Sequence, residues 1–265
     1  MTKKLLNYLK NYVLSIVHKK GCNEQVRIEN AEVTGFEAAF RGMRMPMESG
    51  DRADSKYWLP NMYQEEYEEI VGDDIIWDPY HLGDNDKTLA KKLIAAGAEH
   101  RKFLRYIHVS FDITAPLYLF KELETYKVGT VSNSTSTMHK LADTPITLDC
   151  FEMDDYEELE WKDYEGFMEE YNSSFVWDTL IDALESLRKK YNKTKDKRYW
   201  KELIRLLPES WLQTRTIDLN YEVLRNIYKQ RMGHRLGEWD QILAFIETLP
   251  YSELLLIDSW DDQKE

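Results

Sequence analysis

The chain has 265 residues, of which 35 are Lys or Arg and 48 are Asp or Glu, so its formal net charge is −13. Hydrophobic residues make up 43% of the chain and aromatic residues 13%, a composition that excludes a disordered chain and can supply the core of one large domain. The negative charge excludes general binding of duplex DNA, which needs a cationic surface, but it allows a local basic pocket for one small phosphate.

The N-terminal segment, residues 1–22, is predicted to form an amphipathic helix, because apolar residues such as Leu5, Leu9 and Ile16 recur at helical spacing among lysines. We expect this helix to pack on the body or on another subunit, and binding to a membrane surface is the alternative. The chain has no run of about 18 apolar residues, so no membrane-spanning segment is predicted. Cys22 and Cys150 lack metal-ligand spacing and are predicted to be free, buried thiols in a reducing cytoplasm.

We expect residues 23–250 to form a single domain and residues 251–265 a tail. Within the first half of the domain, residues 25–33 are strand-like, and a polar, aromatic loop region extends to about residue 84. A helix is predicted from residue 85 to a stop at Gly97, followed by a strand at residues 107–114 that alternates with period two. Pro116 can open the next helix, and residues 128–137 are rich in hydroxyl groups and predict a turn or loop.

The second half begins with an acidic insertion, residues 151–171, and is otherwise predicted to be helical. The predicted helices cover residues 174–191, 196–207, 218–232 and 236–248, with Asp196 and Asp218 as N-caps. Strands early in the chain and helices late in it indicate an α+β fold. The acidic insertion lacks the residue order of a calcium loop, and no His, Cys or Glu spacing elsewhere predicts a metal site.

Two separated segments resemble the flavin-dependent thymidylate synthases. The first contains Phe111-Asp112-Ile113-Thr114-Ala115-Pro116, followed by Asn133, Ser136 and the pair Met138-His139; the second contains Leu207-Pro208, Asn220, Arg231 and Glu238-Trp239-Asp240. Order, spacing and flanking helices agree over about residues 85–140 and 200–250. The family's fold, a central antiparallel sheet with long helices, is therefore expected here.

The resemblance implies a pyrimidine nucleotide similar to dUMP as ligand, FAD as cofactor, a role in dTMP biosynthesis and a homotetramer whose sites lie between subunits. Arg231 matches a family arginine at the nucleotide, and Asn220 matches a family asparagine near the flavin. The remaining candidates for nucleotide binding form a loop that can cradle a phosphate or sugar: Lys127, Ser132, Asn133, Ser134 and Ser136. The candidates for cofactor binding are His100, Tyr126 and Asn220, and His100 is alternatively a structural or exposed histidine. Arg41 and Arg44 are additional candidates for phosphate contacts.

The chain departs from the family pattern where that pattern has arginines. Thr125-Tyr126-Lys127 or Tyr126-Lys127-Val128 stands where the family has Arg-His-Arg, and Met138 replaces another arginine. A lysine reproduces the bidentate geometry of a guanidinium poorly, so the departures weaken phosphate and flavin binding. Glu122 stands where the family has Gln or His, and its carboxylate would repel a phosphate unless Lys121 or Lys127 neutralised it.

These departures leave two functions open. The first is a divergent synthase that binds a pyrimidine nucleotide, with FAD, and modifies the base. The second is a scaffold without catalysis that binds nucleotides or proteins, with the acidic insertion as the contact surface; chains of this kind resemble uncharacterised products of bacteriophages, where a counter-defence role is conceivable. Arg231 is alternatively a solvated cation favoured by the end of its helix, and Asn133 alternatively forms a turn.

Overall fold

The structure is a computed structural model that describes residues 26–57, 75–77, 80–154, 156–162 and 170–258. The predicted N-terminal helix, residues 1–22, lies outside the described residues. Parts of the acidic insertion and the last seven residues of the predicted tail also lie outside them.

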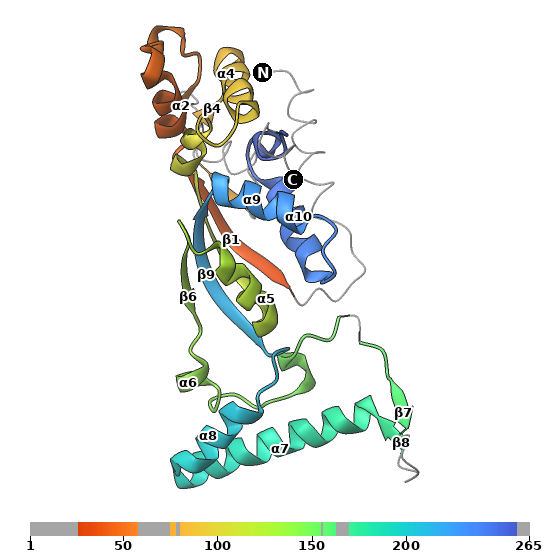
Figure 1. Ribbon diagram of the computed structural model, residues 1–265. Helices are drawn as coiled ribbons and strands as arrows, with labels where there is room; N and C mark the ends of the chain where they lie inside the picture. Colours follow the sequence, from red (N-terminus) through yellow and green to blue (C-terminus); the bar gives the residue numbers. More distant parts are fainter. Residues whose placement is uncertain (1–25, 58–74, 78–79, 155, 163–169, 259–265) are drawn as a thin grey trace, which may run out of the picture.

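A five-stranded sheet forms the centre of the fold (Figure 1). Its order is β3 (Ile75–Trp77), β1 (Arg27–Thr34), β5 (His108–Pro116), β9 (Leu212–Asn220) and β6 (Val131–Ser134). All of its pairings are antiparallel except that of β1 with β3. Two-stranded pairs join β2 (Lys56–Tyr57) to β4 (Tyr80–His81) and β7 (Glu160–Lys162) to β8 (Glu170–Asn172). The expected α+β fold with a central antiparallel sheet is confirmed.

The period-two alternation of β5 separates the two faces of the sheet. Val109, Phe111 and Ile113 are buried in the main core, where Phe111 lies 5.0 Å from the ring of Phe245. The alternate residues, including Ser110 and Asp112, lie on the opposite, polar face. The helices that complete the main core therefore pack on one face of the sheet.

Strand β9 corrects the prediction that a helix begins at Asp218. Residues 212–220 alternate in burial, and β9 pairs with β5 over its whole length, from Leu212 opposite Pro116 to Asn220 opposite His108. The helix begins after Asn220, whose side chain accepts a hydrogen bond from the Val223 N–H at 3.1 Å. The neighbouring strand supplies backbone partners that a local pattern cannot reveal.

Strand β6 corrects the prediction of a loop at residues 128–137. Residues 131–134 pair with β9 and form an edge of the central sheet, with all four residues exposed. Residues with hydroxyl groups are frequent in turns. Here the edge of β9 offers unpaired backbone groups, and residues 131–134 form backbone hydrogen bonds with it. A turn remains at residues 127–130, before the strand begins.

Apart from the N-terminal helix, which lies outside the described residues, the predicted helices are confirmed with small shifts of their ends, and α2 and α6 have no counterpart among them. The α-helices are α2 (Phe36–Arg44), α4 (Asp84–Ala95), α5 (Leu117–Leu123), α6 (Thr137–Lys140), α7 (Ser173–Thr194), α8 (Lys197–Leu206), α9 (Tyr221–Arg231) and α10 (Glu238–Thr248). Short 3-10 helices are η1 (Met45–Met47), η2 (Gly50–Arg52), η3 (Lys102–Tyr106), η4 (Glu124–Tyr126), η5 (Leu148–Cys150) and η6 (Ser252–Leu254). Asp196 caps α8 as expected, because its side chain accepts from the Arg198 N–H.

Two hydrophobic cores occur in the described part of the chain. The main core joins the sheet to α2, α4, α9 and α10. A second, smaller core lies between α7, α8 and the segment around Phe151, where the Phe151 ring contacts Trp177 and Trp211 at 5.3 and 5.5 Å. Figure 1 shows α7 and α8 as a layer at the end of the sheet remote from α2 and α4.

Two further sequence expectations can be compared with the structure. Cys150 is a free thiol, as predicted, but it is half-buried rather than buried, and Cys22 lies outside the described residues. Among the helices in the described part of the chain, none is both long and apolar enough to cross a membrane.

Candidate functional site

Arg231, at the end of α9, is the centre of a cluster of charged and aromatic side chains. We call this cluster the Arg231 cage and define it as Glu122, Tyr126, Arg231, His234 and Trp239. Its members come from α5, η4, the last turn of α9, the turn that follows it and the first turn of α10. Two stretches of the chain, residues 122–126 and 231–239, thus converge on one guanidinium group.

The aromatic walls of the cage hold the guanidinium from the side. Its central carbon lies 4.7 Å from the centre of the Trp239 ring and 5.5 Å from that of Tyr126. The two rings meet edge to face, with their centres 6.5 Å apart. Trp239 is fully buried and the Arg231 side chain is 17% exposed, so these cation–π contacts are shielded from water.

The polar contacts of the cage fix the guanidinium along its edge. Arg231 Nε donates to the Tyr126 hydroxyl at 3.0 Å, and Nη1 lies 3.1 Å from Glu122 Oε2. The same carboxylate oxygen accepts from Trp239 Nε1 at 2.9 Å. Within the described residues Nη2 has no hydrogen-bond partner, so two N–H groups of Arg231 remain for a ligand.

Glu122 is neutralised in the structure by Arg231, a partner that differs from the lysines considered in the sequence analysis. Lys121 instead pairs with Glu209 at 2.6 Å, and Lys127 is exposed with no carboxylate partner in the described part of the chain. His234 Nε2 lies 3.5 Å from the Glu122 carboxylate and 3.2 Å from Arg231 Nη1. Arg231 is therefore a half-buried, paired cation rather than a solvated one.

Asn220 and the turn at residues 127–130 lie next to each other. Gly129 has a φ of +80°, and a Cβ at this position would lie 3.0 Å from Asn220 Nδ2. Since Oδ1 of Asn220 accepts the Val223 N–H, its conformation is fixed by the start of α9. The turn that carries Lys127 therefore lies between Tyr126, which belongs to the cage, and the side-chain amide of Asn220.

The remaining predicted site residues lie outside the Arg231 cage. Ser132, Asn133 and Ser134 are on the edge strand β6, opposite Ile217, Thr216 and Arg215 of β9. Ser136 caps α6 by accepting from the His139 N–H at 3.2 Å. His100 is exposed in the turn between α4 and η3. The structure brings together Tyr126 and Arg231, with Lys127 and Asn220 beside them.

Sequence reasoning missed His234 and the role of Trp239 in the cage. Trp239 belongs to a phrase that resembles the family, which was a signal for its importance, but His234 carries no local signal. His234 follows Arg231 by three positions, and its Nδ1 accepts from the Leu236 N–H at 3.2 Å. This turn directs the histidine back toward Glu122.

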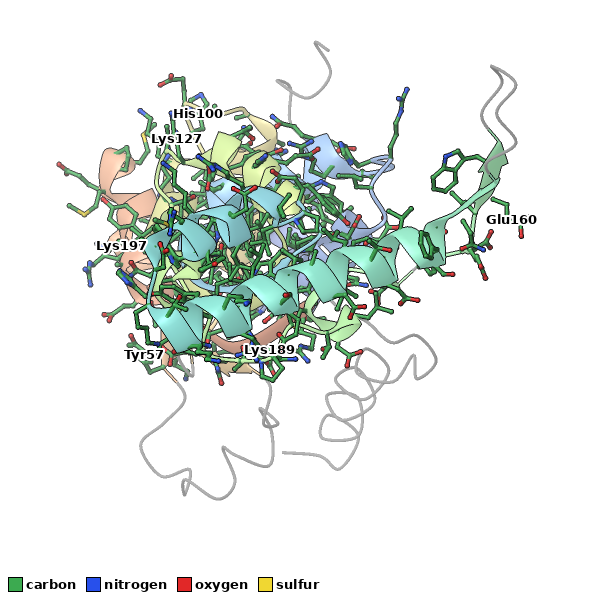
Figure 2. The ribbon with its side chains drawn as sticks, turned by 90° about the horizontal axis from the view of Figure 1, so that it is seen from below. Tyr57, His100, Lys127, Glu160, Lys189 and Lys197 are labelled. Atoms are coloured by element: carbon green, nitrogen blue, oxygen red, sulfur yellow. The ribbon has the colours of Figure 1, made fainter. Side chains whose placement is uncertain are left out.

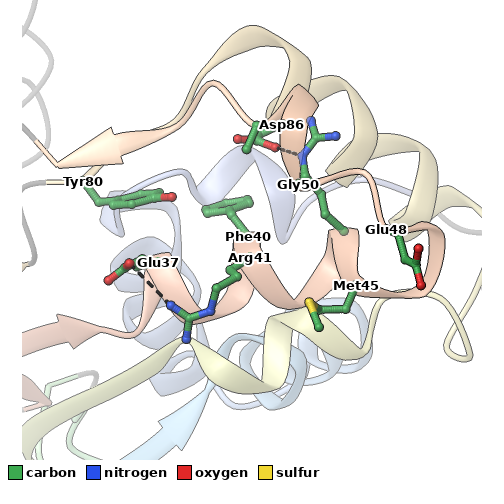
Figure 3. A pocket seen from close by; sticks show the side chains of 10 residues that line it. Glu37, Phe40, Arg41, Met45, Glu48, Gly50, Tyr80 and Asp86 are labelled. Carbon is green, nitrogen blue, oxygen red and sulfur yellow. Dashed lines mark hydrogen bonds and ion pairs between the residues drawn. The ribbon is translucent and has the colours of Figure 1, made fainter.

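Away from the cage, a concave region lies between α2, η1, η2 and α4 and has a volume of about 420 Å³ (Figure 3). Phe40 and Tyr80 stack with ring centres 5.9 Å apart along it. Burial, and secondarily the charge of Asp86, raises the pKa of Tyr80 to about 12. The tyrosine is therefore neutral at physiological pH.

The two arginines of this cavity already have carboxylate partners. Arg44 is 5% exposed and is paired with the equally buried Asp86, while Arg41 lies 3.4 Å from Glu37 at the surface. Burial by itself raises the pKa of Asp86. Hydrogen bonds from Ser55, Arg44 and two backbone N–H groups lower the pKa by more than burial raises it, so the net pKa is below its usual value. Arg44 thus serves the packing of α2 on α4.

No group of three or more His, Cys, Asp or Glu side chains suited to a metal ion occurs in the described ranges. The chemistry that the cage offers is instead that of a fixed, planar cation. Such a cation can recognise a carboxylate, a phosphate or the carbonyl edge of a base.

No protein-family model and no curated protein matches the chain. Solved structures do match it. The thymidylate synthase ThyX from Helicobacter pylori, solved with FAD and dUMP, has a TM-score of 0.55 and 17% identity over 91% of this chain and 99% of its own. The UMP/dUMP methylase PolB from Streptomyces cacaoi, solved with 5-Br UMP, has a TM-score of 0.50 and 13% identity over 88% and 95%. The expected resemblance in fold to the flavin-dependent thymidylate synthases is confirmed.

Proposed function

We propose that this protein binds a pyrimidine mononucleotide, of the dUMP or UMP type, at the Arg231 cage and the adjoining turn at residues 127–130. The observation that carries the proposal is the guanidinium of Arg231, held between Trp239 and Tyr126 with Nη2 unpaired among the described residues. Lys127 adds an exposed positive charge next to the cage. The fold supports the ligand class, because structural neighbours of this fold were solved with dUMP and with 5-Br UMP.

FAD is the proposed cofactor, and the residues beside the cage suit it. The amide of Asn220 and the ring of Tyr126 fit the polar edge and the face of a flavin ring, and Lys127 fits one of its phosphates. When bound, reduced FAD would supply a hydride to the reaction. The neighbour from Helicobacter pylori was solved with FAD as well as with dUMP.

Binding of the nucleotide is tested by isothermal titration calorimetry with dUMP, UMP and uridine. Arg231→Gln is expected to weaken dUMP binding at least tenfold. Arg215→Gln is the matched control, because Arg215 is 16% exposed, lies 4.1 Å from the Phe120 ring and pairs with Glu124. If the two variants lose affinity equally, or if dUMP does not bind at millimolar concentration, the proposal fails. Visible absorbance after reconstitution with FAD tests the cofactor separately.

Methylation of the uracil base is the proposed reaction, and binding without turnover is the second candidate. The loss of the family's arginines favours the second, since the single lysine Lys127 stands in place of Arg-His-Arg and Met138 replaces another arginine. The pairing of Glu122 with Arg231 weakens phosphate binding in both cases. Release of tritium from [5-³H]dUMP, in the presence of FAD, a reductant and a one-carbon donor, distinguishes them. If the protein binds without turnover, exposed carboxylates of the acidic insertion, such as Glu157 and Glu158, are the proposed contact with a partner protein. Replacing them with Gln should then weaken binding of that partner.

The proposal includes a homotetramer, as the family resemblance implies, in the cytoplasm, as the use of cysteine indicates. Light scattering coupled to size-exclusion chromatography measures the assembly directly. A monomer at micromolar concentration would contradict this part of the proposal without affecting the nucleotide titration.

A further inference from the structure

A strongly basic surface lies where α7 ends and α8 begins. We call residues 189–205 the basic elbow. The segment contains eight Lys or Arg residues and two carboxylates, for a net charge of +6, whereas the rest of the chain carries −19. All eight basic residues are exposed. The elbow is therefore a local positive surface on a protein of opposite overall charge.

Pairing within the protein accounts for only part of this charge. Three of the eight cations pair with carboxylates of their own helix or its cap, as Arg198 does with Asp196 at 2.6 Å. The other five have no carboxylate partner in the described ranges: Lys190, Lys193, Lys195, Lys197 and Lys201. Exposed like charges this close repel one another unless an anion lies between them.

The stability of the helices does not explain the position of these lysines either. Lys193, in the last turn of α7, is at the helix end where a cation is favourable. Lys197, however, is the first residue of α8, where the helix dipole disfavours positive charge and no acidic residue of the first turn offsets it. Lys197 therefore weakens α8 locally, so an external anion is the better explanation for it.

The distribution of charge along α7 indicates the shape of that anion. Figure 2 shows Lys189 and Lys197 near one end of α7 and Glu160 beyond the other end. Asp178 and Asp182 are exposed on the half of α7 nearer Glu160. A helix of 22 residues is about 33 Å long, so a straight duplex lying along it would meet the acidic half as well. A flexible single strand can follow the elbow alone.

Half-buried aromatic side chains accompany the lysines. Tyr199 and Trp200 are both partly exposed, and Trp200 Nε1 donates to the Met138 carbonyl at 3.0 Å, which fixes the indole ring. Lysines that contact phosphates, interleaved with aromatic rings on which bases stack, are the usual components of single-strand binding surfaces.

We propose that the basic elbow binds single-stranded nucleic acid. The lysines contact successive phosphates without reading the sequence, and Tyr199 offers a face to a base. The elbow shares no residue with the Arg231 cage, so this inference does not rest on the proposed function. It adds a polyanion-binding surface to a chain whose net charge excludes general binding of a duplex.

Fluorescence anisotropy of the full chain with labelled dT15 and rU15 tests the proposal. The elbow variant carries Lys190→Gln, Lys193→Gln, Lys197→Gln and Lys201→Gln. The control variant carries the same substitution at four exposed lysines elsewhere, with the same change in net charge: Lys56, Lys91, Lys92 and Lys102. We expect the elbow variant to lose at least tenfold in affinity at 50 mM salt and the control less than threefold.

The salt dependence supplies a second readout. Each phosphate contact to a single strand contributes about 0.7 to the slope of log K against log salt, so four lost contacts should reduce the slope by up to about 3. Three results would overturn the proposal. The two variants could lose affinity equally, a 15-base-pair duplex could bind as tightly as the single strands, or polyglutamate could bind when neither single strand does. Photo-crosslinking of dT15 to the unmodified protein must label residues 189–205, which keeps the test decisive if the elbow variant does not fold.

Discussion

Replacing Glu122 with Gln tests whether the carboxylate of the Arg231 cage restricts phosphate binding. The substitution removes the negative charge 3.1 Å from Arg231 Nη1 but keeps an oxygen that can accept from Trp239 Nε1. Two unit charges about 4 Å apart interact by about 4 kcal/mol at an effective dielectric constant of 20. Because Glu122 is 31% exposed, solvent screens much of this energy.

We therefore expect Glu122→Gln to bind dUMP about 5- to 30-fold more tightly, which corresponds to about 1–2 kcal/mol. The folded protein should lose about 1–3 kcal/mol of unfolding free energy, since Arg231 loses its ion pair with Glu122. Calorimetric titration with dUMP and uridine measures the first effect, and urea denaturation measures the second.

Glu124→Gln is the matched control, because Glu124 pairs with Arg215 of β9, outside the Arg231 cage, and is 64% exposed. It should leave the affinity for dUMP unchanged. The reasoning is refuted if Glu122→Gln binds dUMP no more tightly than the unmodified protein. An equal gain for uridine, which lacks the phosphate, would refute it as well.

Two further predictions concern stability. The pKa of Glu185 is lowered from 4.5 to about 2, chiefly by hydrogen bonds from Arg188, so the stabilising effect of the carboxylate is complete above pH 4.5 and is lost as the pH falls toward 2. In urea titrations, the difference in unfolding free energy between the unmodified protein and Glu185→Gln should therefore shrink over this range. A difference that stays constant with pH would contradict the assignment. Gly129→Ala should reduce the unfolding free energy by about 1–2 kcal/mol, because φ is +80° and the added Cβ would lie 3.0 Å from Asn220 Nδ2. A thermal melt measures this loss. Gly50→Ala is the control: its Cβ would have no atom within 4 Å, so this variant should melt as the unmodified protein does.

The fold class and most helices could be predicted from the sequence because their signals are local. The alternation of residues 107–114 and the cap at Asp196 each depend on a few neighbouring residues, and both are confirmed. Strand β9 was missed because its strongest determinant is pairing with β5, about 100 positions earlier in the chain. The edge strand β6 was missed because its residues carry hydroxyl groups that also suit a turn, and its pairing with the distant strand β9 is not visible in the local sequence.

The candidate site was predictable only in part. Arg231 and Tyr126 were identified through the family resemblance, and the structure brings them into contact at 3.0 Å. His234 was not identified, because nothing in its neighbourhood distinguishes it from an exposed turn histidine. Ser132 and Ser136 were assigned to the same site; in the structure Ser132 lies on the edge strand β6 and Ser136 caps α6, and neither belongs to the Arg231 cage.

By itself, the sequence determined the composition of the cores, the period of each helix and strand, and the charge of each segment, including the six net positive charges of residues 189–205. Only the tertiary structure decided which of these charges are paired. Glu122 and Arg231 are 109 positions apart, and their contact arises because α5 and α9 both pack beside the central sheet. The energy of an ion pair depends on distance and burial, which the order of residues along a chain does not contain.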